Sequence, residues 1–527
     1  MHTFYPSSSD ITFNQLHRAI HVKDVERIIK EMIIKVPSIA TPRGIARERF
    51  VKEILTEKYE ELGYGDLLSD CMDTIEEGTL RDLMVAQLSE KLDFQAQIMK
   101  RAMKGLGTDE DMLITFLCTL DEADIYKLQT AYSERFEESM ETAVLRETSG
   151  KFKRVLLLAG CDQAPECYAK VFNEAIRGAG TDCKAVVRLM VTLDHEMMAK
   201  TRDAYMRLFK RDLLKAITSE FKVSGDFKRI CEGLVTKHPS KIQKEITDEE
   251  YDNEIDLMHK AVKGLGTDEK AIVELLCNKT HEQINEFKLK YQLKFNQMLK
   301  DRLREETTGL FENKYFRETI QGLLTDREEQ IAVYLKEAFG GWTASKDDWG
   351  LISMLVHRTP AQMKEIKKQY MITYGSDLVQ DIRKNCMGDY ENALVALVVE
   401  RERTVARGIK AAIKAWSNKT TQGSLIALLT NRDEDMPNLR KAFMKEFDNK
   451  SLQGVIKKEC EGLFAECLVS LCSYTPPKEG KVYDANYGVD TSGPQGTTSS
   501  GFPGASGSTG VGKQHRGGNG SDSDESF

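Results

Sequence analysis

The stretch Met103-Lys104-Gly105-Leu106-Gly107-Thr108-Asp109 decides the fold, because the chain repeats it. An acid, Glu147, follows this loop about 40 residues later. The same loop and a matched acid return twice more, as Ile176-Arg177-Gly178-Ala179-Gly180-Thr181-Asp182 with Glu220, and as Val262-Lys263-Gly264-Leu265-Gly266-Thr267-Asp268 with Glu306. Three copies at one spacing indicate a repeated structural unit.

The loop chemistry predicts a cation site. Two glycines one residue apart let a short connection between helices adopt positive φ and turn its carbonyl oxygens outward. Ca²⁺ takes 6 to 8 oxygen ligands, mostly carbonyls, carboxylates and waters, so loop carbonyls and one distant acid make a partial shell. The expected metal ligands are Met103, Gly105, Gly107 and Glu147; Ile176, Gly178, Gly180 and Glu220; and Val262, Gly264, Gly266 and Glu306.

Each loop also carries a basic side chain beside the expected cation. These are Lys104, Arg177 and Lys263. An open coordination position next to a basic group suits a phosphate that bridges the ion and the protein. Phospholipid headgroups are the ligands that this arrangement indicates.

Two other interpretations of the Gly-x-Gly loop remain. A nucleotide-binding loop is one, but no Gly-Lys-Ser/Thr follows and no strand pattern precedes the glycines. A helix C-cap followed by a new N-cap is the other, and Thr267 is expected to cap the following helix in this way. Capping is compatible with a cation site, yet capping alone does not need an acid about 40 residues away.

The ends of the units extend the pattern beyond the loop. They read Leu145-Arg146-Glu147-Thr148-Ser149-Gly150-Lys151-Phe152 and Leu303-Arg304-Glu305-Glu306-Thr307-Thr308-Gly309-Leu310-Phe311. With the loops, these segments resemble the annexin repeat. The resemblance implies an all-α array of helical repeats, Ca²⁺ as cofactor and calcium-dependent binding to acidic phospholipid membranes. It also implies that the hydroxyls of Thr108, Thr181 and Thr267 approach the headgroup.

Composition limits the class of partner. A net charge of −8 argues against nucleic acid and, taken alone, against attachment to an acidic membrane surface. Membrane attachment therefore requires a bridging cation.

The eleven cysteines form no Cys-x-x-Cys pair and are expected to be reduced core thiols. With no signal peptide and no apolar run long enough to span a bilayer, we expect a cytoplasmic protein, peripheral at the cytosolic face of membranes.

A period near 75 residues predicts six helical repeats. The resemblance to annexins implies about five helices in each. The expected segments are a head (1–12), a degenerate repeat (13–88), two repeats with calcium loops (91–162 and 166–238), a linker (239–253), a third repeat with a calcium loop (254–324), two degenerate repeats (328–399 and 401–473) and a disordered Gly/Ser/Pro-rich tail (474–527). Family members usually carry four repeats or a multiple. Repeats two to five are therefore expected to form the family's disc with one and six as additions, or the two triplets form separate lobes.

The degenerate repeats lack parts of the site. Repeat one has no Gly-x-Gly loop, and repeat six keeps an acid, Glu459, without the glycine pair. Repeat five has a longer loop that contains Trp342, and Asn385 stands where the acid is expected. Because an amide is a weaker and uncharged ligand, calcium affinity there should be low. Trp342 is either a packing residue or a side chain that enters the headgroup region.

Three classes of function follow from these observations. The first is calcium-dependent binding to anionic phospholipid by repeats two, three and four. The second is a structural or scaffold role with cytoskeletal or membrane-protein partners, in which calcium acts as regulator. Catalysis is not expected, because the nine histidines show no spacing typical of a nucleophile, a general base or a zinc site.

Overall fold

The computed structural model describes residues 8–36, 46–104, 107–177, 182–219, 223, 225–237, 245–263, 267–307, 314–340, 346–415 and 419–475. These residues form helices and connecting loops and contain no strand, which confirms the all-α prediction. The first helix begins at Ser8, inside the segment expected to be a head. Nearly all of the expected tail lies outside the described residues, as does Trp342.

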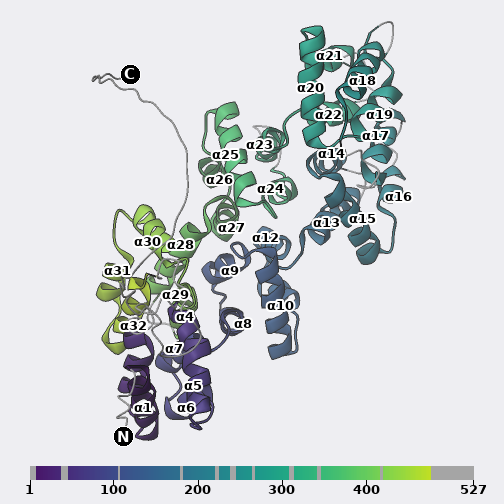
Figure 1. Cartoon of the computed structure of the whole chain (residues 1–527). Coiled ribbons are helices and arrows are strands. Elements are labelled where there is room, and N and C mark those ends of the chain that lie inside the picture. Colours follow the sequence, from purple (N-terminus) through teal and green to yellow (C-terminus); the bar gives the residue numbers. More distant parts are fainter. Residues whose placement is uncertain are drawn as a thin grey trace, which may run out of the picture. The chain divides into compact units, whose positions relative to one another are not determined.

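The helices fall into six groups in chain order, which we call repeats one to six (Figure 1). Repeat one contains α1 (Ser8–His21), α2 (Val25–Ile29), η1 (Lys30–Lys35), α4 (Arg47–Arg49), η3 (Phe50–Leu55), α5 (Thr56–Glu61), α6 (Leu67–Thr74) and α7 (Thr79–Leu88). Repeat two contains α8 (Lys91–Ala102), α9 (Glu110–Leu117), α10 (Glu122–Phe136), α11 (Met140–Glu147) and α12 (Gly150–Gly160). Repeat three contains α13 (Ala164–Ile176), α14 (Cys183–Thr192), α15 (His195–Phe209), α16 (Leu213–Thr218) and α17 (Gly225–Thr236).

The same five-helix order continues to the end of the described chain. Repeat four contains α18 (Asp248–Ala261), α19 (Glu269–Cys277), α20 (His281–Phe295), α21 (Leu299–Thr307) and α22 (Lys314–Leu323). Repeat five contains α23 (Arg327–Ala338), α24 (Asp348–Leu355), α25 (Pro360–Tyr374), α26 (Leu378–Asn385) and α27 (Gly388–Val398). Repeat six contains α28 (Arg401–Lys414), α29 (Lys419–Leu429), α30 (Met436–Glu446), α31 (Leu452–Glu459) and α32 (Gly462–Ser473).

An aspartate caps the second helix of repeats two to five. In repeat four the side chain of Asp268 accepts a hydrogen bond from the backbone N–H of Ala271 at 3.0 Å. The prediction that Thr267 caps this helix is therefore wrong by one residue. The carboxylate is the stronger acceptor and also carries a negative charge, which the positive end of the helix dipole favours.

The repeats pair across the chain rather than in two successive triplets. Repeat one contacts repeat six through η1 with α32 and α7 with α29. Repeat two contacts repeat five through α12 and α9 with α27, and repeat three contacts repeat four through α14 with α22 and α17 with α19. Repeats one and six thus add one further pair to the arrangement that repeats two to five form.

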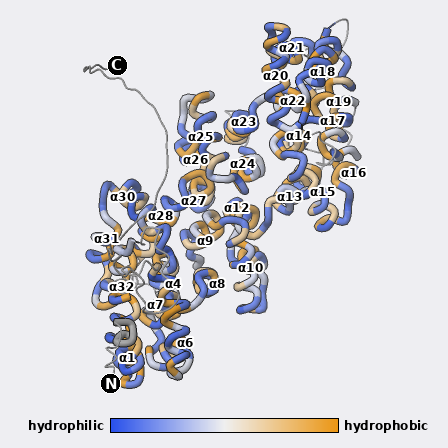
Figure 2. Tube along the Cα trace, in the orientation of Figure 1, coloured by the Kyte–Doolittle hydropathy of each residue, from blue (hydrophilic) through white to orange (hydrophobic). Residues whose placement is uncertain are grey.

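The apolar residues form two cores, which meet at repeat two. In Figure 2 the hydrophobic positions recur along one side of successive helices. One core joins repeats three, four and five, and the other joins repeats one, two and six. Helix α12 serves both, because Val155 lies in the first core and Leu156 in the second.

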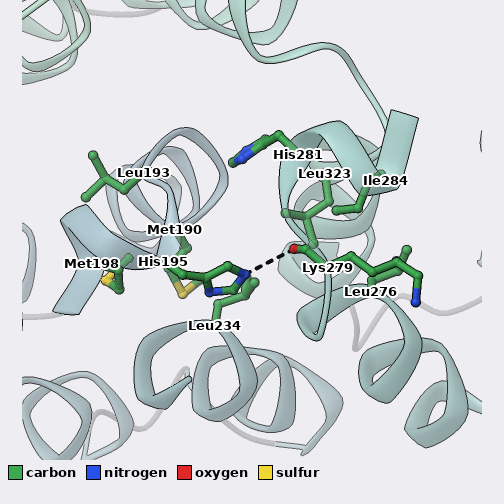
Figure 3. Close-up of a pocket in the computed structure, with 10 residues that line it drawn as sticks. All are labelled: Met190, Leu193, His195, Met198, Leu234, Leu276, Lys279, His281, Ile284 and Leu323. Carbon is green, nitrogen blue, oxygen red and sulfur yellow. Dashed lines mark hydrogen bonds between the residues drawn. The ribbon is translucent and has the colours of Figure 1, made fainter. Parts of the chain in front are cut away.

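Two partly buried histidines join repeat three to repeat four. His195 Nε2 donates to the carbonyl of Lys279 at 3.1 Å (Figure 3), and His281 Nε2 donates to the carbonyl of Val191 at 2.7 Å. Burial lowers the pKa of both imidazoles, so they are neutral donors near pH 7. These two hydrogen bonds connect repeats three and four directly.

Among the described residues, no helix is both long enough and apolar enough to cross a bilayer.

Candidate calcium and phospholipid site

One backbone hydrogen bond closes the loop between the first and second helices of repeats two to five. The N–H of the capping aspartate donates to the carbonyl of an alanine in the preceding helix. The distances are 2.9 Å for Asp109 to Ala102, 2.7 Å for Asp182 to Ala175, 2.9 Å for Asp268 to Ala261 and 2.9 Å for Asp347 to Ala338. Repeats two, three and four therefore share one loop length, and repeat five has two residues more.

The first expected ligand of each loop can offer only its backbone. The side chains of Met103, Ile176 and Val262 are buried in the core. At the start of the loop, their backbone carbonyls are therefore the groups that could bind a cation. Calcium sites commonly use such carbonyl oxygens. Gly107 has a φ of +107°, a conformation that a residue with a Cβ rarely adopts.

Several expected site residues lie outside the described residues. They are Gly105, Gly178, Gly180, Thr181, Glu220, Gly264 and Gly266. The ends of the loops and two of the three acids, Glu147 and Glu306, are among the described residues.

In repeat two the loop and the distant acid meet. The hydroxyl of Thr108 donates to the backbone carbonyl of Glu147 at 3.3 Å, across 39 positions of sequence. The carboxylate of Glu147 accepts a hydrogen bond from Nε of Arg146 at 2.7 Å. A basic group therefore already lies against the acid that we expect to bind the cation.

Repeat four brings two expected ligands to a single atom. Nη2 of Arg302 donates to the carbonyl of Val262 at 2.8 Å and lies 2.5 Å from Oε1 of Glu306. Val262 begins the loop and Glu306 lies near the end of α21, 44 positions later. The positively charged guanidinium of Arg302 thus contacts both oxygen atoms that are expected to bind the cation.

This arrangement fits a calcium ion. A backbone carbonyl and a carboxylate are hard oxygen donors of the kind that Ca²⁺ prefers. Their convergence on a guanidinium nitrogen shows that the two elements place these oxygens around one cationic position. The part of the chain that the structure describes holds no group of three His, Cys, Asp or Glu side chains arranged for a metal.

In repeat three, most of the expected site lies outside the described residues. The described part ends with Ser219, whose hydroxyl accepts a hydrogen bond from Nη2 of Arg211 at 2.7 Å. Ile176 ends α13, and the exposed Arg177 follows it as in the other loops. The ligand role of Glu220 stays a prediction.

Repeat five carries a fixed cation at the corresponding place. Lys346 occupies the position of Thr108, directly before the capping aspartate, and its ammonium donates to the backbone carbonyl of Asn385. The amide of Asn385 turns back to its own helix, where Nδ2 donates to the carbonyl of Asp381 at 2.8 Å. A lysine charge and the missing carboxylate both disfavour calcium in this repeat.

Of the expected headgroup residues that the structure describes, the basic ones are exposed and the threonines are not. Lys104, Arg177 and Lys263 are exposed beside their loops, while Thr108 and Thr267 are partly buried. In repeat two the described contact of the threonine is with the acid-bearing helix rather than with solvent. The basic side chains are therefore free to reach a phosphate outside the loop.

Three basic residues at these sites were missed by reasoning from the sequence. Arg302 precedes Glu306 by four positions, which places both on one face of α21. Arg146 is adjacent to Glu147, and Lys346 replaces the loop threonine of the other repeats. The four-residue spacing was a usable signal for Arg302, but nothing in the sequence indicated its contact with the Val262 carbonyl.

Comparison with known proteins agrees with the repeat structure. A family model described as Annexin matches residues 94–159, 168–234, 253–315 and 330–397, together half of the chain. The chain is 27% identical over 308 residues to annexin A13 of Mus musculus, covering 58% of this chain and 94% of that protein. It is 24% identical over 362 residues to annexin A6 of Mus musculus, covering 58% of this chain and 51% of that protein.

Solved structures show the same fold. Annexin III aligns with a TM-score of 0.53 at 23% identity, covering 58% of this chain and 93% of that chain. A calcium-bound annexin (Sm)1 aligns with a TM-score of 0.51 at 22% identity, covering 59% of this chain and 90% of that chain. The protein belongs to the annexin family, as the repeat pattern predicted. Annexins are generally non-enzymatic proteins that bind phospholipid in a calcium-dependent manner.

Proposed function

We propose that this protein binds anionic phospholipid membranes in a calcium-dependent manner through the loops of repeats two, three and four. The observation that carries the proposal is the convergence of the Val262 carbonyl and the Glu306 carboxylate on Arg302. Calcium, when bound, would supply a divalent charge that these oxygens share with a lipid phosphate. Repeats one, five and six then serve as structural repeats.

The residues of the site have separate roles in this proposal. The buried side chains of Met103 and Val262 anchor the start of the loop and leave their backbone carbonyls as the groups that can bind the ion. Glu147 and Glu306 supply the charged oxygen; Thr108 bonds the backbone of Glu147 to its loop, and Arg302 occupies the Glu306 oxygen until calcium replaces it. The exposed basic residues beside the loops bind phosphate oxygens of the headgroup by charge-assisted hydrogen bonds.

The protein as a whole is acidic, which supports a requirement for calcium in membrane binding. With a net charge of −8, approach to an anionic surface is unfavourable until the acids at the loops are neutralised. Removal of calcium should therefore release the protein. We place it in the cytoplasm, peripheral at the cytosolic face of membranes, and its eleven free cysteines support a reducing compartment.

Glu306→Gln is expected to remove the charged ligand of repeat four. Calorimetric titration with calcium should then show affinity for this site lowered by about tenfold or more, since even outer-shell changes cost a metal site this much. Glu305→Gln is the matched control, because Glu305 is exposed on the same helix, one residue away, with Oε2 3.7 Å from Arg302 Nη1. Equal calcium affinity in the two variants would remove Glu306 from the proposed site.

Arg302→Leu is expected to have the opposite effect. The guanidinium occupies the oxygens that calcium needs, and its charge repels the ion, so its removal should raise the calcium affinity of repeat four. A hydrogen bond to a charged group contributes about 1.5 to 3 kcal/mol, which corresponds to a gain of about 10- to 150-fold. Calcium titration by calorimetry measures the change, and a fall in affinity would show that Arg302 positions the ligands instead of competing for them.

A further inference from the structure

A polar pocket of about 480 Å³ lies where repeats one, two and six meet, away from the calcium loops. Its lining includes Lys91 at the start of α8 and Arg432 in the connection that follows α29. Arg49 and Lys52 of repeat one line it as well. The four-repeat match begins at residue 94, so most of the lining lies outside the part of the chain that this match covers.

Arg432 is the most buried of the cations that line this pocket. It is only 5% exposed, and its nearest carboxylate, Asp435, lies 3.8 Å from Nη1. Its buried Nε has no hydrogen-bond partner among the described residues. A buried guanidinium with so little compensation is costly, because its lost hydration is not replaced.

Two further cations face Arg432 at the starts of two helices. Lys91 is the first residue of α8 and Arg401 the first residue of α28, and neither forms an ion pair with any described residue. Burial, then Arg432, then Arg401 lower the pKa of Lys91 to about 8. Burial and, after it, Arg401 lower the pKa of Arg432 to about 10. The three positive charges therefore repel one another inside the fold.

Several of the carboxylates that line the pocket are bound by groups of repeat one. Asp433 binds Nη2 of Arg47 at 2.5 Å and the backbone N–H of Glu48 at 2.7 Å. Glu48 and Glu90 lie 3.4 and 3.7 Å from Nζ of Lys52. Among the described residues, Asp435 is therefore the one carboxylate that forms an ion pair with the cluster of Lys91, Arg401 and Arg432, at the long distance of 3.8 Å.

We propose that this cluster binds a small oxyanion, namely a phosphate group, between repeats one, two and six. Lys91 and Arg432 line the pocket and offer positively charged donors, and Arg401, which does not line it, adds a third positive charge nearby; such a cluster suits a tetrahedral oxyanion. Helix α8 begins at the pocket with no side-chain cap at Glu90, so its first N–H groups add donors and a favourable dipole. Six carboxylates line the pocket as well and disfavour a polyanion, so the ligand carries a single phosphate or sulfate group.

Sulfate is the probe for a direct test, because its charge is constant over the pH range used. Calorimetric titration of the full chain in calcium chelator should show millimolar or tighter binding. Lys91→Gln should weaken it by about tenfold, the loss of one charge-assisted contact, and Arg401→Gln should weaken it as well, by the loss of a nearby positive charge. Arg49→Gln should leave it unchanged, because Arg49 lines the same pocket but is exposed and paired with Glu53 at 2.8 Å.

The pH dependence of sulfate binding gives a second readout. Between pH 7 and pH 9 Lys91 loses its proton, so affinity should fall by about tenfold in the natural sequence and stay constant in Lys91→Gln. The charged groups that face Lys91 are Arg432, Arg401, Glu48 and Asp435.

Two further experiments distinguish a lipid headgroup from a soluble phosphate as the ligand. Retention on phosphatidic acid vesicles in chelator, competed by sulfate, would identify a lipid headgroup as the ligand. Competition by inorganic phosphate without such retention would identify a soluble phosphate. Absence of sulfate binding at millimolar concentration, or binding equally strong in Lys91→Gln, Arg401→Gln and Arg49→Gln, would overturn the proposal.

Discussion

Replacing Glu147, Glu220 and Glu306 together by glutamine is expected to abolish calcium-dependent binding to phosphatidylserine vesicles. Each substitution removes the charged oxygen of one loop. Because several weak sites on one chain act together, the combined loss should reach about 100-fold or more in apparent affinity. Co-sedimentation with vesicles across a calcium titration measures it.

A matched triple variant separates this effect from net charge. Glu60, Glu134 and Glu305 are exposed, and Glu60 and Glu134 lie away from the loops, so their joint replacement by glutamine changes the charge equally. That control should bind vesicles as well as the natural sequence. If both triple variants lost binding to the same extent, the loops would have no special role in attachment.

Asp433→Ala is expected to have the largest effect on stability. Arg47 is 1% exposed, and its guanidinium is paired with Asp433 at 2.5 Å between repeats one and six. Removing one partner leaves a buried charge uncompensated, which lowers the free energy of unfolding by about 3 to 5 kcal/mol. The same change removes the acceptor for the backbone N–H of Glu48.

Glu434→Gln provides the control for this prediction, because Glu434 is the exposed neighbour of Asp433. Urea unfolding followed by circular dichroism should show a lower midpoint for Asp433→Ala than for Glu434→Gln. Coincident midpoints would mean that the pair between repeats one and six does not stabilise the fold.

The repeat order and the helical content were predictable from the sequence because they rest on local signals. Glycine pairs, capping residues and helical periodicity act within a few residues of one another. The exact cap was not predictable, since Thr267 and Asp268 are both good N-cap residues and the backbone turn decides between them.

Contacts between distant segments were not predictable in the same way. The sequence indicated that Val262 and Glu306 belong to one site, but not that Arg302 joins them. A long flexible side chain can reach several partners, and which one it meets depends on how α21 packs against the loop. Lys346 at the Asn385 carbonyl is a second example of this kind.

The placement of repeats one and six depended on the same kind of long-range contact. The sequence left open whether they extend the four-repeat arrangement or belong to separate triplets. The pairs Arg47 with Asp433 and Thr79 with Gln422 join helices more than 340 positions apart. The structure therefore connects the two outer repeats directly, which creates the pocket at Lys91 and Arg432.

The most direct test of the account is co-sedimentation of the natural sequence with phosphatidylserine vesicles as calcium is raised and then chelated. We expect binding that appears with calcium, reverses with chelator and is absent on phosphatidylcholine vesicles. Binding to phosphatidylserine that is equal with calcium and with chelator, or no binding at millimolar calcium, would contradict calcium bridging by the loops.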